Sequence, residues 1–146
     1  MTDVRIIPAT EAHALEIAPR LTVSRGICDA WRQMKRTQED AVLYNVRHST
    51  HAWAAYADNE LAALFGLAAR SIVDDSATPW LLPTTIVYRH RVKFLRMSIA
   101  FIAEARRIYP TLTGIVDQEH TQSIAWLKWL GFKIEGEGQF LQVTHG

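Results

Sequence analysis

The stretch that decides the fold is TGIVDQEHTQSIAWLKWLGF, residues 113–132. Its first residues, Thr113–Asp117, are typical of a short apolar strand, and Thr121–Leu130 has apolar residues at helical spacing. Gly131 is expected to end that helix, and Phe132–Ile134 to begin the next strand. The helical residues expected to face inward are Ile124, Leu127 and Trp129 or Leu130. A strand, a helix and a strand in this order predict a mixed α/β sheet.

The segment before this stretch predicts a strand followed by a long helix. Trp80–Tyr88 is rich in β-branched residues, and Pro83 inside it predicts a bulge or a sheet edge. Arg89–Tyr109 has the clearest helical periodicity, and Pro110 is expected to stop it. The residues predicted to form the buried stripe of this helix are Val92, Leu95, Ile99, Ile102 and Ala105.

The N-terminal half predicts a strand, helices and a hairpin. Asp58-Asn59-Glu60 is a turn signal, so the segments on either side are expected to pair, although the alanines of Leu61–Ala69 would also suit a helix. Pro19 is expected to end or kink the first helix. The remaining predicted elements are a strand at Val4–Ile7 before Pro8, a helix capped by Thr10, a second capped by Ser24 and running to about Arg36, a third at Glu39–Val46, strands at His51–Ala57 and Leu61–Val73, a loop at Asp74–Ser76, and a last strand at Phe140–Val143.

Length and composition predict one domain over residues 1–146. The net charge of +1 argues against a dedicated nucleic-acid binder, which usually carries a strongly basic face. The single cysteine, Cys28, cannot form an internal disulfide, which indicates a reducing compartment. The start of the sequence lacks a signal-peptide pattern, and the longest apolar run, Leu61–Ala69, is too short for a membrane span. We therefore expect a cytosolic protein with no membrane partner.

The element order, together with five residues of the C-terminal half, resembles the GNAT acetyltransferase fold. GNAT proteins often place Asn, Ala, Tyr and Gly-Phe at spacings that this chain fills with His120, Ser123, Leu127 and Gly131-Phe132. The fold class implied is α/β and GNAT-like, with a mixed central sheet flanked by helices.

A closer resemblance is to GNAT-like proteins of short-tailed phages. The segments that carry it are Leu64–Ala68, Pro79–Thr84, Phe94–Ser98, Tyr109–Pro110, Val116–Asp117 and Trp126–Phe132. Members of that family are internal virion or virion-assembly proteins, or are classed as acetyltransferases. The resemblance implies phage or host proteins as partners, and a location in the host cytoplasm or packaged in the virion. This chain departs from the family pattern with Pro83 in place of Gly and His120 in place of Asn.

Two groups that an active GNAT enzyme uses are missing from the sequence. The resemblance places the loop that holds the coenzyme A pyrophosphate at Tyr88–Phe94, with His90, Val92 and Phe94 at the glycine positions. Side chains there would obstruct close approach of the backbone to the phosphates. The tyrosine that protonates the leaving thiolate is replaced by Leu127. We therefore expect no cofactor, and acetyl-CoA only if the chain is an enzyme.

The sequence nevertheless supplies candidate site residues. Those for an acetyl-CoA site are Leu82 and Thr84 beside the pantetheine arm, and Arg89, His90, Arg91 and Lys93 beside the phosphates. The catalytic candidates are Asp117, Glu119, His120 and Ser123, which lie where a GNAT sheet opens; Asp117 is equally suited to capping the last helix or its entry turn. A metal pair of His48 and His51 lacks a third ligand at sensible spacing. Core packing is the main expectation for Trp31, Trp53, Trp80, Trp126 and Trp129.

Three functions remain open at this stage. The first is a virion-associated or assembly protein that keeps the GNAT scaffold with a degenerate acetyl-CoA site. The second is an acetyl-CoA-dependent N-acetyltransferase with an atypical cofactor loop. The third is an inhibitor or modifier of a host protein.

Overall fold

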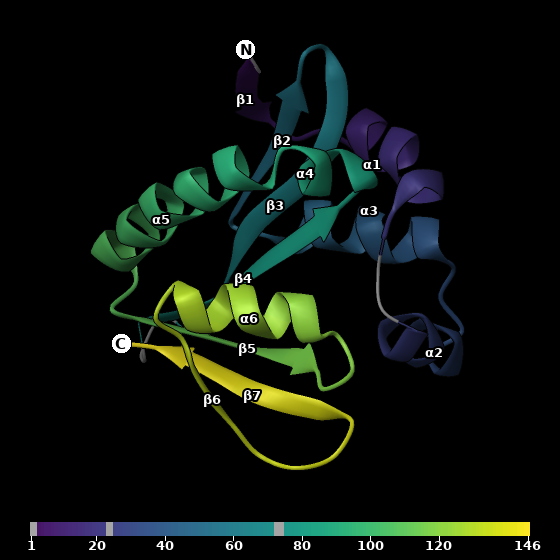
Figure 1. Ribbon diagram of the computed structural model, residues 1–146. Coiled ribbons are helices and arrows are strands. Elements are labelled where there is room, and N and C mark those ends of the chain that lie inside the picture. Colours follow the sequence, from purple (N-terminus) through teal and green to yellow (C-terminus); the bar gives the residue numbers. More distant parts are fainter. Residues whose placement is uncertain (1–2, 23–24, 72–74) are drawn as a thin grey trace. The chain divides into compact units, whose positions relative to one another are not determined.

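The computed structural model describes residues 3–22, 25–71 and 75–146. Its strands form a seven-stranded mixed sheet in the order β1-β2-β3-β4-β5-β7-β6 (Figure 1). The β4–β5 pair is parallel, whereas β1–β2, β2–β3, β5–β7 and β6–β7 are antiparallel. The strands are β1 Val4–Pro8, β2 His51–Ala57, β3 Glu60–Ser71, β4 Ser76–Pro83, β5 Thr111–Asp117, β6 Lys133–Glu135 and β7 Phe140–His145. The helices are α1 Glu11–Ile17, a 3₁₀ turn at Ala18–Arg20, α2 Arg25–Gln33, α3 Gln38–His48, α4 Thr85–Arg89, α5 Arg91–Ile108 and α6 Thr121–Trp129.

The chain consists of two compact units. The first comprises Met1–Ala68 and Trp80–Arg91, and the second comprises Ala69–Pro79 and Val92–Gly146. The expectation of a single domain over residues 1–146 stays a prediction.

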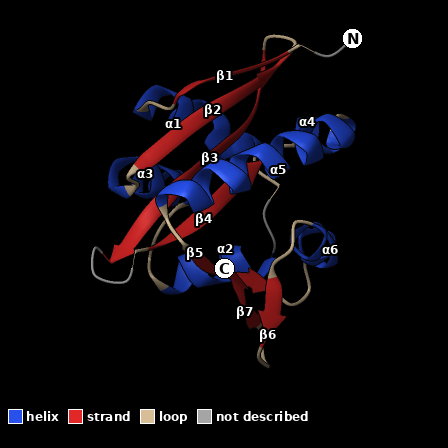
Figure 2. Cartoon of the chain, turned by 90° about the vertical axis from the view of Figure 1, so that its left-hand side faces the viewer, coloured by secondary structure: helices blue, strands red, loops and turns tan. Residues whose placement is uncertain are grey.

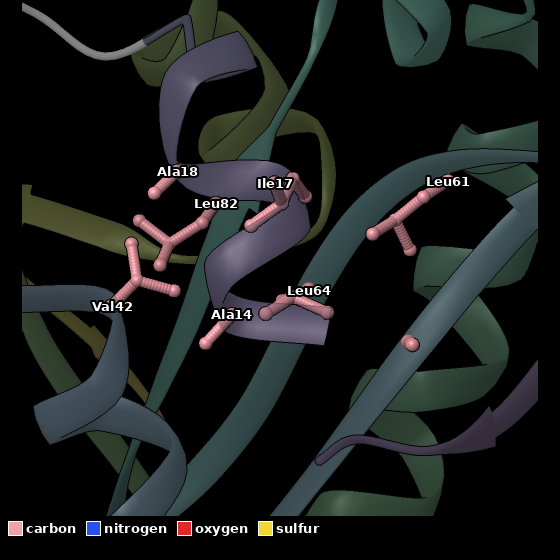
Figure 3. Packing of buried hydrophobic residues seen from close by; sticks show 8 residues of the cluster. Ala14, Ile17, Ala18, Val42, Leu61, Leu64 and Leu82 are labelled. Atoms are coloured by element: carbon pink, nitrogen blue, oxygen red, sulfur yellow. The ribbon is translucent and has the colours of Figure 1, made fainter. Parts of the chain in front are cut away.

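The first unit has a core built from short apolar side chains. Ile17 of α1, Val42 of α3 and Leu64 of β3 are each 0% exposed and belong with Leu61 and Leu82 to one buried cluster. Figure 3 shows the side chains of Ile17, Val42 and Leu82 close together. Burial of side chains of this size stabilises a fold by roughly 1.5–3 kcal/mol each. Their spacing along α1 and β3 is therefore what holds the helices against the sheet.

The predicted hairpin is present, and the helix considered for Leu61–Ala69 is wrong. Asp58 and Asn59 have left-handed φ values of 49° and 70°, as a tight two-residue hairpin turn requires. The turn also holds the start of β1, because the Asp3 N–H donates to Asp58 Oδ1 at 2.8 Å and the Asp58 N–H donates to the Asp3 carbonyl at 2.9 Å. At the other end of β1, the Ala9 N–H donates to the Ala52 carbonyl at 3.0 Å. Figure 2 shows β1, β2 and β3 as neighbouring strands.

The second unit is fastened by His145 at the end of β7. Arg106 Nη1 of α5 lies 3.1 Å from His145 Nδ1, and His145 Nε2 lies 3.1 Å from the Leu130 carbonyl at the end of α6. A guanidinium can only donate hydrogen bonds, so Nδ1 is the acceptor and Nε2 carries the proton given to Leu130. Phe132 packs edge-on against the same imidazole at 5.0 Å between ring centroids. One neutral imidazole thus joins the ends of two helices to the last strand.

The predicted strand Trp80–Tyr88 is wrong beyond Pro83. Pro83 is the last residue of β4, and a short helix, α4, follows at Thr85–Arg89. Thr84 caps this helix by accepting a hydrogen bond from the Ile86 N–H at 3.2 Å. The β-branched residues here suit a strand, but the cap and the proline before it favour a new helix. The long helix therefore begins at Arg91 instead of Arg89.

The predicted buried stripe of the long helix is wrong in part. Val92 is 58% exposed and Ile99 is 50% exposed, whereas Phe94, Ile102 and Ala105 are buried. Apolar residues occupy more than one face of α5, so their period alone does not decide which face turns inward.

Several smaller expectations also change. The second helix ends at Gln33 instead of Arg36, Ser76 belongs to β4, and Trp129 is 56% exposed instead of buried. The cap predicted at Ser24 and the residues Val73 and Asp74 lie outside the described residues.

The contact of Gly66 with the Trp80 ring makes a prediction about stability. A Cβ at position 66 would lie 2.7 Å from Trp80 Cζ2 and would also overlap the His51 carbonyl. We expect Gly66→Ala to lower the free energy of unfolding by about 1–3 kcal/mol, as overpacking does. Urea denaturation measures this change.

Gly114→Ala is the matched control for that measurement. A Cβ at position 114 would meet Thr78 Cγ2 at 3.5 Å and Val143 Cγ2 at 3.6 Å, which is ordinary contact. This variant is expected to be neutral or to gain up to about 1 kcal/mol. Equal stability losses in both variants would contradict the proposed overlap.

Candidate functional site

The end of β4 uses its main-chain groups within the first unit. Pro83 has no N–H, and its carbonyl accepts hydrogen bonds from the Thr22 N–H at 2.9 Å and from Thr22 Oγ1 at 3.1 Å. The Thr84 N–H and hydroxyl both donate to the Ala62 carbonyl, at 2.9 and 2.8 Å. Leu82 is 6% exposed and belongs to the core cluster. The groups of positions 83 and 84 that could pair with a pantetheine arm are therefore already engaged.

At the junction between α4 and α5, a main-chain donor is likewise engaged within the fold. The His90 N–H donates to the carbonyls of Ile86 and Val87, each at 3.2 Å. The sequence has no glycine between Gly66 and Gly114, and the described residues around this junction include none with a left-handed φ.

The side chains at the start of α5 bear on whether a phosphate could approach its backbone. Val92 is exposed on the first turn, and Phe94 is 8% exposed, with its ring turned into the protein. A phosphate cradle needs free N–H groups that a ligand can approach closely. Because the His90 N–H is engaged and no glycine is present, this junction lacks the features of a main-chain cradle for the diphosphate of coenzyme A.

The predicted cations lie on the surface around this junction. Arg89 Nη2 lies 3.5 Å from Glu60 Oε2, with both side chains about 60% exposed, so their mutual attraction contributes at most roughly 1 kcal/mol. Arg91 and Lys93 are exposed on the first turn of α5 and form no ion pair with another described residue. Two cations at a helix N-terminus oppose the helix dipole.

Of the four catalytic candidates, Asp117 ends β5, Glu119 and His120 lie in the turn that follows, and Ser123 lies in the first turn of α6. Asp117 is 2% exposed, and its Oδ1 accepts hydrogen bonds from Gln139 Nε2 at 2.6 Å and from the Glu119 N–H at 3.0 Å. The Gln139 carbonyl accepts from the Gln118 N–H at 2.8 Å. The carboxylate therefore shapes the entry turn of α6, as the alternative interpretation of Asp117 expects.

His120 and Ser123 form a local pair at the start of α6. Ser123 Oγ lies 2.9 Å from His120 Nδ1, and the His120 N–H donates to the Asp117 carbonyl at 2.9 Å. Both side chains are half-buried, whereas Glu119 is exposed. A hydroxyl bonded to an imidazole can exchange a proton, but the same geometry also ties N-cap to N3 in the first turn of a helix. Leu127 is half-buried and has no proton to donate.

The other candidates pack against neighbouring groups. His48 contacts the Tyr44 ring, whereas His51 stacks on Trp53, and no three metal-binding side chains cluster among the described residues. Trp80 Nε1 donates to Ser49 Oγ at 2.6 Å. Trp31 packs against the core cluster of the first unit, while Cys28 and Trp126 are half-buried.

Two residues of the site were missed in the sequence. Thr22 donates a hydrogen bond to the Pro83 carbonyl although 61 positions separate the two residues. Gln139 donates one to the Asp117 carboxylate across 22 positions. No local pattern marks such pairs, because both are polar residues in irregular segments.

Solved structures similar to this chain are acetyltransferases. PaiA N-acetyltransferase from Thermoplasma acidophilum, in complex with coenzyme A, has a TM-score of 0.67 and 15% identity over 97% of this chain and 98% of its own. A spermidine N-acetyltransferase chimera from Vibrio cholerae has a TM-score of 0.68 and 12% identity, covering 97% and 93%. RimL, a ribosomal-protein α-N-acetyltransferase in complex with coenzyme A, has a TM-score of 0.66 and 13% identity, covering 97% and 93%.

These likenesses span both chains almost completely, and the chain therefore has the GNAT fold. No protein-family model and no curated protein matches the sequence. Among the described residues, no helix is long and apolar enough to cross a membrane.

The bond between Gln139 and the buried Asp117 makes a second prediction. Gln139→Ala removes a donor to a carboxylate that is 2% exposed, and we expect the free energy of unfolding to fall by about 1–3 kcal/mol. Urea denaturation at neutral pH measures it. Gln142→Ala, at an exposed position of β7, is the matched control. A loss of the same size in the control would show that the Gln139 bond is not responsible.

Proposed function

We propose that this chain is a GNAT-fold protein that acts through contacts with other proteins and does not use acetyl-CoA. The observation that carries the proposal is the use of main-chain groups at the cofactor position. Thr22 and Ala62 engage Pro83 and Thr84, and the His90 N–H is bonded within α4.

The cost of this arrangement to coenzyme A binding follows from the hydrogen bonds that a diphosphate loses. A hydrogen bond to a charged group contributes about 1.5–3 kcal/mol. A deficit of 1.4 kcal/mol weakens binding about tenfold, so the loss of the one bond that the engaged His90 N–H cannot give lowers affinity by about tenfold or more.

The proposed absence of acetyl transfer has a second support in Leu127. A general acid contributes about 10²–10⁴-fold in rate, and a leucine supplies none of it. Acetyl transfer would then lack both a binding site for its cofactor and a general acid.

The proposed role is that of a virion-associated or assembly protein in the host cytoplasm. The support for it is the resemblance of six sequence segments to GNAT-like proteins of short-tailed phages. The partners of such a protein are other phage or host proteins.

An acetyl-CoA-dependent N-acetyltransferase is the second candidate function. The observation in its favour is that Arg91 and Lys93 are exposed side chains without an ion pair among the described residues, so they are available to an anion. In that case these side chains would hold the phosphates, and the catalytic group would come from Asp117, Glu119, His120 or Ser123.

Calorimetric titration of the chain with acetyl-CoA separates the two functions. We expect no heat of binding and no thermal shift at millimolar ligand, because the Thr84 and His90 N–H groups are engaged within the fold and no glycine lets a diphosphate approach the start of α5 closely. A coenzyme A-binding acetyltransferase titrated in parallel shows that the assay detects binding.

Micromolar affinity that disappears in Arg89→Ala/Arg91→Ala would overturn the proposal in favour of the enzyme. Micromolar affinity unchanged in that variant would overturn it as well, since the cofactor would then be bound by other groups. A crystal grown with acetyl-CoA would show which groups hold it.

A further inference from the structure

Helix α5 has an exposed line of apolar residues in addition to its buried face. Val92 is 58% exposed, Ile99 is 50% exposed and Ala103 is exposed. Their spacing of seven and four residues places them on one line along the helix. The buried residues Phe94 and Ala105 lie on the opposite face, and the buried Ile102 lies between the two faces.

The surface around this stripe is basic. The exposed cations Arg96 and Lys93 lie along one side of it at its N-terminal end and form no ion pair with another described residue. Further along, Arg107 Nη1 lies 3.1 Å from Glu104 Oε1, and Arg106 is held by the Pro110 carbonyl and His145. The whole helix has five cations and one carboxylate. The apolar residues Val92, Ile99 and Ala103, together with the neighbouring cations Lys93 and Arg96, are called the α5 stripe below.

Charge decides which occupant suits the α5 stripe. A second copy of α5 would bring cations against cations, which is unfavourable at an interface. The apolar line consists of Val, Ile and Ala, without the large aromatic or leucine-rich face with which interfacial helices enter a bilayer. A narrow apolar line with cations beside it complements a helix that has apolar residues on one face and carboxylates along its edges.

We propose that the α5 stripe docks an acidic amphipathic helix of a partner protein. Val92, Ile99 and Ala103 pack against apolar residues of the partner at i, i+4 and i+7, and Arg96 and Lys93 pair with its carboxylates. The inference rests on the proposed function, because it names the class of partner that such a protein would contact.

The probe is a synthetic helical peptide with leucines along one face and glutamates elsewhere. The affinity of a fluorescent form of this peptide for the full chain is measured by fluorescence anisotropy. The binding site is located from the amide chemical shifts of the ¹⁵N-labelled chain. We expect shifts at the residues of the α5 stripe, and an affinity that falls as salt rises, because exposed charge pairs are screened. The comparison peptides are a scrambled sequence of the same composition and a version with lysine in place of glutamate.

Two pairs of variants localise the binding. We expect Ile99→Asp and Arg96→Glu each to weaken binding about tenfold, which corresponds to 1.4 kcal/mol. Leu15→Asp, at a position of α1 that is 48% exposed, and Lys128→Glu on α6 are the matched controls and should bind as the parent chain does. Circular dichroism and the melting temperature establish that each variant is folded.

Several results would overturn the inference. They are failure of the acidic peptide to bind at millimolar concentration, equal binding of the scrambled or lysine peptide, shifts away from α5, and preferential binding to anionic vesicles or to an RNA oligonucleotide. Failure of the proposed function shows separately, as binding of acetyl-CoA in the calorimeter. The two failures are therefore distinguishable.

Discussion

The hydrogen bonds at the end of β4 are the constraint on which the rest of the first unit depends. The Pro83 carbonyl is bound by Thr22, and Thr84 is bound to Ala62 through both its N–H and its hydroxyl. Because Thr84 is fixed in this way, its hydroxyl oxygen is placed to cap α4, and the chain turns directly into a helix. The strand end is consequently an internal junction, and its polar groups serve the fold.

Much of this architecture follows from local sequence signals. The hairpin at Asp58-Asn59, the helix capped by Thr10 and the helix stop at Gly131 were predictable, because short-range geometry decides each of them. The helix α4 was not predicted, since Ile86 and Val87 favour strands and the cap at Thr84 depends on its bond to Ala62. The choice of which α5 residues are buried was wrong in part, because apolar residues lie on more than one face of the helix.

The candidate site was predictable in its residue content and less so in its chemistry. Asp117 and His120 lie at the two ends of the turn between β5 and α6, and Ser123 follows in the first turn of α6, as their closeness in sequence implies. The engagement of Asp117 by Gln139 depends on a loop that returns from later in the chain, and no pattern in the sequence encodes that approach. A shared scaffold leaves the chemistry open for the same reason, because activity depends on a few polar groups whose partners are set by distant segments.

The two ends of β1 have a consequence for how the molecule behaves at high concentration. This strand is at the edge of the sheet, and the reciprocal bonds of Asp3 with Asp58, together with the bond from Ala9 to Ala52, fix its register. A slip by one residue would turn Ile7 to the wrong side and break all three bonds. The strand is five residues long, has Arg5 exposed and ends on Pro8, and each of these features disfavours pairing of its free edge with another chain.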